Sequence, residues 1–129
     1  MGREKVYNLE ERTYQFARDC RLLIGLLPGT LSNTEDGKQL IKASGSIGAN
    51  YIEANEKLGR KDLALRLRIA RKEAKEAQYW LRLLKDMNGR HGERIIELIK
   101  EATELRRILS SIINRIANAK ESSQTKLPT

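Results

Sequence analysis

The chain has 129 residues, a single cysteine and a formal net charge of +8, with 33% charged and 40% hydrophobic residues. These values exclude a disulfide framework and a disordered chain, and they fit one domain with its own core. Aromatic residues make up only 5%, which favours packed helices over sheets. The longest apolar run, residues 22–27, is too short to cross a bilayer, so we expect a cytoplasmic protein without a membrane partner.

The first predicted helix spans residues 8–27, with Asn8 as its N-cap and Pro28-Gly29 as its stop. Apolar residues spaced three and four apart place one stripe on a single helical face. This inward stripe contains Leu9, Thr13, Phe16, Cys20, Leu23 and Leu27.

A polar connector over residues 29–34 leads to the second predicted helix, at residues 35–58, with Thr34 as its N-cap. Its stripe contains Leu40, Ser44, Ile47, Tyr51, Ala54 and Leu58. Gly45 and Gly48 lie inside this helix, where glycine costs about 1 kcal/mol relative to alanine. We therefore expect a neighbouring helix to approach this face closely.

The third predicted helix, residues 61–88, and the fourth, residues 92–119, carry sustained heptads of Leu, Ile and Ala. Their stripes contain Leu63, Leu67, Ala70, Ala74, Ala77, Leu81 and Leu84, and then Ile95, Leu98, Ala102, Leu105, Leu109, Ile112 and Ile116. Short connections predict an all-α, antiparallel, up-down-up-down four-helix bundle over residues 1–120. Residues 121–129 are expected to form a flexible polar tail.

Residues for catalysis are scarce. The single histidine, His91, is placed in a loop, and Cys20 is placed on an inward stripe. Two carboxylate pairs, Glu53 with Glu56 and Glu73 with Glu76, have the spacing of an acid/base pair and equally of ion pairs with neighbouring cations. We expect no metal, no cofactor, no small-molecule substrate and no enzymatic activity.

A basic stripe follows the third helix, where Lys61, Arg68, Lys75 and Arg82 recur every seven residues. Arg60, Arg71 and Lys72 flank this stripe. Cations about 10 Å apart fit a phosphate backbone, and the same pattern fits a solvated helix face.

Two further patterns have alternative interpretations. The polar row Ser46, Asn50, Glu53 and Lys57 on the second helix fits solvent, another subunit, or partners for arginines of the third helix. Apolar residues outside the four stripes suggest either a subunit interface or a wider core within one chain. These residues are Ile69, Tyr79, Trp80, Leu83, Ile96, Ile99 and Ile113, with Tyr79, Trp80, Ile96, Ile99 and Ile113 as the interface candidates.

Residues 44–54 resemble the Ser-Ile-x-x-Asn-Ile-x-Glu signature of the 23S rRNA intervening-sequence proteins, also called S23-like proteins. The matching positions are Ser46, Ile47, Asn50 and Glu53. Residues 67–81 resemble the family's third helix, and the similarity spans about residues 8–117. The resemblance implies a bundle that assembles into a ring, typically a homopentamer, without an established enzymatic activity.

These patterns together predict a non-enzymatic oligomer that associates with nucleic acid, RNA or DNA, with structured RNA suggested by the resemblance. The alternative is a protein-binding scaffold, or an accessory protein of a retroelement-type reverse transcriptase, whose charge serves solubility. That retroelement role is an analogy of fold with a related bundle family.

Overall fold

The computed structural model describes residues 8–56 and 59–126, and these residues form long helices without a strand. The helices are α2 (Leu9–Leu26), α3 (Leu31–Ala54), α4 (Arg60–Met87) and α5 (Gly92–Lys126), with a 3₁₀ turn, η1 (Gly89–His91), between the last two. The all-α class with four long helices is therefore confirmed.

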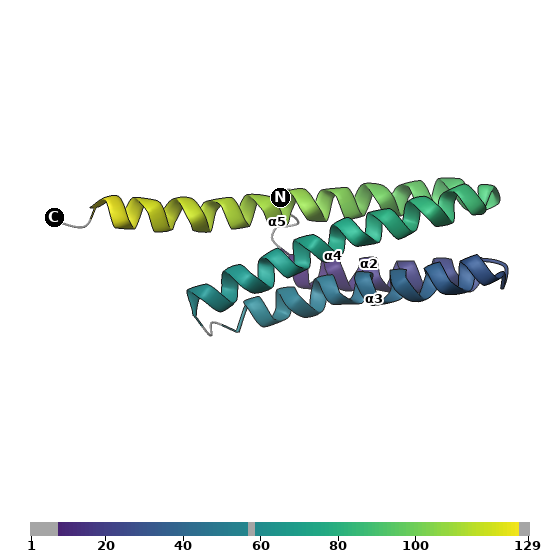
Figure 1. Ribbon diagram of the computed structural model, residues 1–129, viewed down its shortest axis with the longest axis horizontal. Helices are drawn as coiled ribbons and strands as arrows, with labels where there is room; N and C mark the ends of the chain where they lie inside the picture. Colours follow the sequence, from purple (N-terminus) through teal and green to yellow (C-terminus); the bar gives the residue numbers. More distant parts are fainter. Residues whose placement is uncertain (1–7, 57–58, 127–129) are drawn as a thin grey trace.

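The four helices lie alongside one another over part of their lengths (Figure 1). The α2–α3 connection and the α4–α5 connection lie at the same end of the molecule, and the C-terminal end of α3 lies near the N-terminal end of α4 at the other end. α3 packs along both α2 and α4, α5 packs along α4, and α2 and α5 share a smaller contact.

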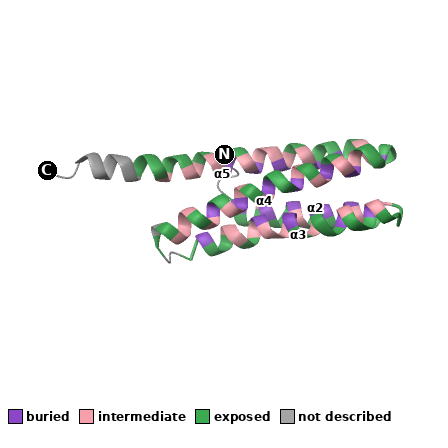
Figure 2. Ribbon diagram, in the orientation of Figure 1, coloured by how far each residue is buried: buried purple, intermediate pink, exposed green. Residues whose placement is uncertain are grey.

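The core lies between the four predicted stripes. In the first three stripes, every described member is buried except Leu27, Tyr51 and Leu63, which are half-buried against the core. In α5 the buried residues run from Ile95 to Leu109 (Figure 2). Ile112 and Ile116, the last two members of the fourth stripe, are half-buried against the core. The predicted inward faces are thus confirmed for the described residues, while Leu58 lies outside them.

α5 is much longer than α2, and its C-terminal part extends past the other helices (Figure 1). α2 has 18 residues and α5 has 35, which correspond to about 27 and 52 Å of helix. The expected end near residue 119 was wrong, because the helix continues to Lys126 through most of the predicted tail. No glycine or proline interrupts the sequence between Gly92 and Pro128, so the chain contains no stop signal there.

The start of α3 also differs from the sequence prediction. Thr30, not Thr34, is the N-cap, and its hydroxyl accepts a hydrogen bond from the backbone N–H of Asn33 at 3.1 Å. Residues 31–34, expected in the connector, therefore belong to the first turn of the helix. Asn8 stands at the N-cap position of α2, but its side chain makes no capping hydrogen bond.

Two buried asparagines join the ends of the helices. The side chains of Asn33 and Asn88 exchange two amide hydrogen bonds of 2.8 Å, and each also donates to a backbone carbonyl, of Pro28 and of Leu84 respectively. Both residues are at most 7% exposed. Because a buried amide is costly without partners, this pair fixes the α2–α3 connection against the end of α4.

The close approach expected at the glycines of α3 is present at Gly48. A Cβ atom there would lie 2.9 Å from the hydroxyl oxygen of Thr13 on α2, so only glycine fits without a shift. Gly45 has more room, since its nearest neighbour is a terminal nitrogen of Arg21 at 3.3 Å. Among the described helices, none has a stretch long and apolar enough to span a membrane.

Candidate nucleic-acid interface

The outward face of α4 carries the predicted basic stripe. Lys61, Arg68, Lys75 and Arg82 are all exposed, and seven residues of helix separate each from the next. The rise is about 10 Å per step, and a seven-residue repeat drifts only about 20° around a straight helix. The four side chains therefore form one continuous row of positive charge about 30 Å long.

These four cations lack the acidic neighbours that usually accompany a solvated helix face. At the positions three and four residues away from any of them, the sequence contains a single acid, Asp86. Among the described residues, none of the four makes an ion pair or a side-chain hydrogen bond. Exposed lysines elsewhere do pair along their helices, as Lys38 does with Glu35 at 3.5 Å and Lys100 with Glu97 at 3.7 Å.

The residues predicted to flank the stripe are placed differently. The half-buried Arg71 donates to the hydroxyl of Ser110 on α5 at 3.5 Å. Lys72 lies 3.8 and 3.9 Å from the carboxylates of Glu73 and Glu76, which supports the ion-pair interpretation of that acidic pair. Arg60 begins α4, and its side chain lies outside the described part of the chain. Lys61, Arg68, Lys75 and Arg82 are consequently the cations of α4 best placed to meet a polyanion.

Two apolar side chains interleave with the stripe. Leu65, 49% exposed, lies between Lys61 and Arg68, and Tyr79, 53% exposed, lies between Lys75 and Arg82. Lys61 and Arg68 border an open groove of about 590 Å³, whose lining includes Ile113 and Ile116 of α5.

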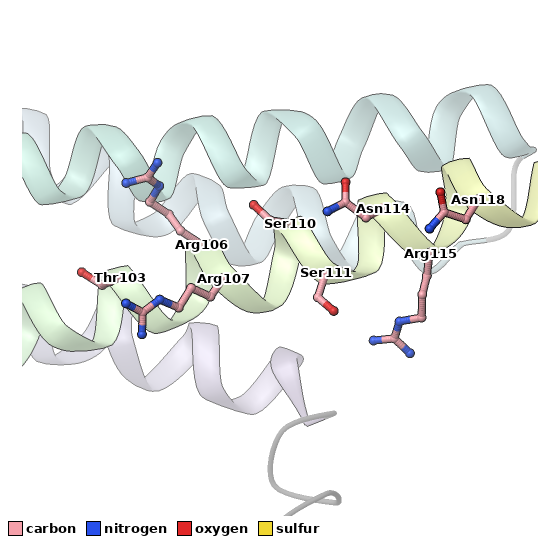
Figure 3. A pocket seen from close by; sticks show the side chains of 8 residues that line it. All are labelled: Thr103, Arg106, Arg107, Ser110, Ser111, Asn114, Arg115 and Asn118. Atoms are coloured by element: carbon pink, nitrogen blue, oxygen red, sulfur yellow. The ribbon is translucent and has the colours of Figure 1, made fainter.

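A polar hollow on α5 was missed in the sequence analysis. It measures about 650 Å³, and Arg106, Ser110 and Asn114 lie on its side toward α4 (Figure 3). Arg106 donates to the side-chain oxygen of Gln78 at 2.8 Å, and Gln78 donates to Thr103 at 2.6 Å. The hollow is lined by Thr103, Arg106, Arg107, Ser110, Ser111, Asn114, Arg115 and Asn118.

The sequence signal for this second basic surface is an acid-free segment. Residues 105–120 contain three arginines and one lysine but no aspartate or glutamate. Serine and asparagine are weak helix formers, so their recurrence on an exposed helix face is unusual. The apolar stripe of this segment predicts the inward face of the helix, and it gives no sign of the polar hollow on the opposite side.

The family signature on α3 forms a hydrogen-bonded contact with α4. Asn50 donates to the backbone and hydroxyl oxygens of Ser46 at 2.9 and 3.0 Å, and its own oxygen accepts from Arg66 at 3.2 Å. Ile47 is fully buried in the core, and Glu53 is exposed. The polar row has three interpretations, and Ser46 and Asn50 fit the one in which the row holds an arginine of the third predicted helix. Lys57 lies outside the described residues.

The candidate interface residues separate into two groups. Trp80, Ile99 and Ile113 are half-buried and pack against the core of the same chain. Tyr79 and Ile96 remain 53% and 40% exposed. The single chain therefore covers part of the surplus apolar surface itself and leaves these two side chains accessible.

The residues considered for catalysis lie apart. Cys20 is fully buried, and burial raises the pKa of its thiol to about 12. His91 is half-buried in η1. Burial, followed by the neighbouring Glu76, raises the pKa of Glu73 above its usual range. Within the described residues, no cluster of histidine, cysteine and carboxylate side chains is arranged to hold a metal ion.

Comparisons with known proteins agree with the signature. The sequence profile of a family described as 23S rRNA-intervening sequence protein matches residues 7–111. This chain is 31% identical in sequence to a protein of unknown function whose crystal structure is known. That protein comes from the S23 ribosomal protein family of Bacteroides thetaiotaomicron VPI-5482. That similarity has a TM-score of 0.74 and covers 85% of this chain and 98% of the other. No curated protein matches the chain.

Proposed function

The chain belongs to the 23S rRNA-intervening sequence protein family, and from that premise we propose that it binds structured RNA through the outward face of α4. The observation that carries the proposal is the row of four exposed cations, Lys61, Arg68, Lys75 and Arg82, which have no acidic partner within the described part of the chain. In this proposal the ammonium and guanidinium groups contact phosphates, and the RNA is selected by shape.

The charge pattern favours a polyanion over a solvated face. A helix face that serves solubility alone gains from opposite charges at i, i+3 and i, i+4, and like charges at those spacings are unfavourable. α4 instead places Arg68 and Arg71, and Arg71 and Lys75, at such spacings. Repulsion of this kind is relieved when a phosphate backbone lies along the row and its counterions are released.

The test is the salt dependence of binding to a fluorescent RNA hairpin, followed by anisotropy. The variant replaces Lys61, Arg68, Lys75 and Arg82 with glutamine, which lowers the formal net charge from +8 to +4. A matched control replaces four exposed cations of α2 and α3 with glutamine and has the same net charge as the α4 variant. These cations are Arg18, Arg21, Lys38 and Lys42.

The wild type and the control are expected to bind at low salt with an affinity that falls steeply as salt rises. The α4 variant is expected to lose most of the affinity, with a salt slope smaller by about 3 units if each cation neutralises one phosphate. Equal losses in the two variants would show that net charge, rather than the row, governs binding. Absence of wild-type binding at low salt would overturn the proposal, and capture of a nuclease-insensitive protein partner would then favour the scaffold alternative.

We further propose that the chain is an antiparallel bundle that assembles into a ring, as the family resemblance implies. What supports assembly is exposed apolar surface outside the core, including Leu22, Leu31 and Met87, which are 52%, 79% and 62% exposed. The mass of the native protein, measured with and without nuclease, reports the subunit number and any nucleic acid that purifies with it. A monomer at micromolar concentration would overturn this part.

A further inference from the structure

The outward face of α4 holds an exposed aromatic side chain, Tyr79, between Lys75 and Arg82, two cations that make no ion pair with any described residue. Tyr79 follows Lys75 by four residues and precedes Arg82 by three, so all three side chains share one helical face. More than half of Tyr79 is accessible, at 53%. An apolar ring at this position contributes little to the core of the chain.

The ring of Tyr79 is held in place by its neighbour. Its centroid lies 4.9 Å from that of Trp80, and the two ring planes meet at 78°, an edge-to-face arrangement. Trp80 itself is half-buried and packs against the core. Because this contact favours one orientation of the ring, a flat ligand that stacks on it orders fewer bonds than it would on an isolated tyrosine.

The chemistry that recognises such a surface is a nucleobase with a phosphate on each side. Every base presents a π-face to an aromatic ring, and RNA-binding proteins commonly stack unpaired bases on tyrosine. In a continuous duplex the bases are stacked inside and cannot reach Tyr79. We infer that Tyr79 is a stacking subsite for one unpaired base, with Lys75 and Arg82 holding the flanking phosphates, an inference that rests on the proposed function of α4.

This subsite defines the class of RNA that the row would prefer. Phosphate contacts along the row fit any helical stem, whereas Tyr79 adds affinity only where a base leaves the stack. The preferred partner is therefore a stem interrupted by a bulge or closed by a loop beside the bound segment.

The experiment compares two RNA duplexes that differ in one nucleotide. The first is a continuous stem with blunt ends, and the second is the same stem with a single bulged 2-aminopurine, whose fluorescence falls when it stacks. The wild type is expected to bind the bulged stem about fivefold or more tightly than the continuous one, and to quench the probe. Tyr79→Ala is expected to lose that preference and the quenching, with unchanged affinity for the continuous stem.

Two variants control for the aromatic ring and for the fold. Tyr79→Phe keeps the ring and is expected to retain both the preference and the quenching. Tyr14→Ala removes another exposed tyrosine, on α2, and is expected to behave as the wild type. Thermal unfolding of each variant establishes that the bundle is intact.

The outcomes separate this inference from the proposed function. Equal wild-type affinity for the two stems, or equal losses for both in Tyr79→Ala, would overturn the stacking subsite and leave phosphate binding standing. Failure to bind either stem would overturn both. A change in native mass caused by Tyr79→Ala in the absence of RNA would place Tyr79 in a subunit contact and overturn the subsite.

Discussion

The inward and outward faces of α4 differ in whether their side chains have partners within the chain. On the inward face, Ala70, Ala74 and Ala77 are fully buried and belong to the hydrophobic core. On the outward face, the cations of the basic row are exposed, and they have no acidic partner among the residues that the structure describes. An unpaired group is costly inside a protein and tolerated at its surface, so the inward face specifies the fold and the outward face is free for binding.

The largest effect expected from this comparison is at two adjacent residues. Leu81 is fully buried and Arg82 is exposed. Leu81→Ala is expected to lower the free energy of unfolding by about 2–5 kcal/mol, because it removes buried methyl groups and leaves a cavity. Arg82→Ala is expected to change it by less than about 0.5 kcal/mol. Urea unfolding followed by circular dichroism measures both, and similar losses in the two variants would contradict the division of α4.

A smaller effect is expected at the buried polar pair. Asn88→Ala leaves the amide of Asn33 buried without its reciprocal partner, at an expected cost of about 1–3 kcal/mol. The double variant Asn33→Ala, Asn88→Ala is expected to cost less than the sum of the single variants, because it leaves no orphaned side-chain amide. Additive costs in this denaturation cycle would show that the two amides contribute independently.

The helix faces were predictable from the sequence, whereas the helix ends were not. The inward stripes follow from three-and-four spacing, a local property that survives in the folded chain. The start of α3 was misplaced because Thr30 and Thr34 are both suitable N-cap residues, and only the structure shows the hydroxyl of Thr30 bonded to the backbone N–H of Asn33. The side-chain partner of Asn33 lies 55 positions away, and no local pattern reveals it. α5 was ended too early because the polar run from Glu121 to Thr125 predicted a tail, although no glycine or proline follows Gly92 within the helix.

The charges of the candidate site could be predicted from the sequence, whereas its side-chain contacts could not. The seven-residue row was readable from the sequence, and the shortage of acids three and four residues away was readable too. Three facts needed the structure. These are the hydrogen bond from Arg71 to Ser110, the contact between Asn50 and Arg66, and the exposed Tyr79 set against Trp80. Each depends on which side chains the packing of separate elements, or the choice of rotamer, brings together.

An effect of about 1 kcal/mol is expected where α2 and α3 approach most closely. Gly48→Ala places a Cβ atom 2.9 Å from the hydroxyl oxygen of Thr13, so it is expected to lower the free energy of unfolding by about 1 kcal/mol or more. Gly45→Ala meets only the flexible end of Arg21 and is expected to stabilise the helix by up to about 1 kcal/mol.

Relief of the clash tests its cause. In a Thr13→Ala background, where the hydroxyl is absent, Gly48→Ala is expected to cost much less than in the wild type. Thermal or chemical unfolding of the four proteins completes the cycle. If the cost of Gly48→Ala is the same in both backgrounds, Thr13 is not the neighbour that requires glycine.

The smallest effect is expected in the reaction of Cys20 with a thiol reagent, because the native wild type should not react. Its thiol is fully buried, and because burial raises the pKa to about 12, the thiol stays protonated and unreactive between pH 7 and pH 9. A disulfide reagent is therefore expected to modify it only in denaturant.

The matched outward position is the exposed Ser111 of α5, and Ser111→Cys in a Cys20→Ala background is expected to react at once in native buffer. Rapid modification of Cys20 in the native protein would show that α2 separates from the bundle readily, which its smaller contact with α5 would explain. The inward face of α2 would then belong to an opening element, and the division between inward and outward faces would hold for α3, α4 and α5 alone.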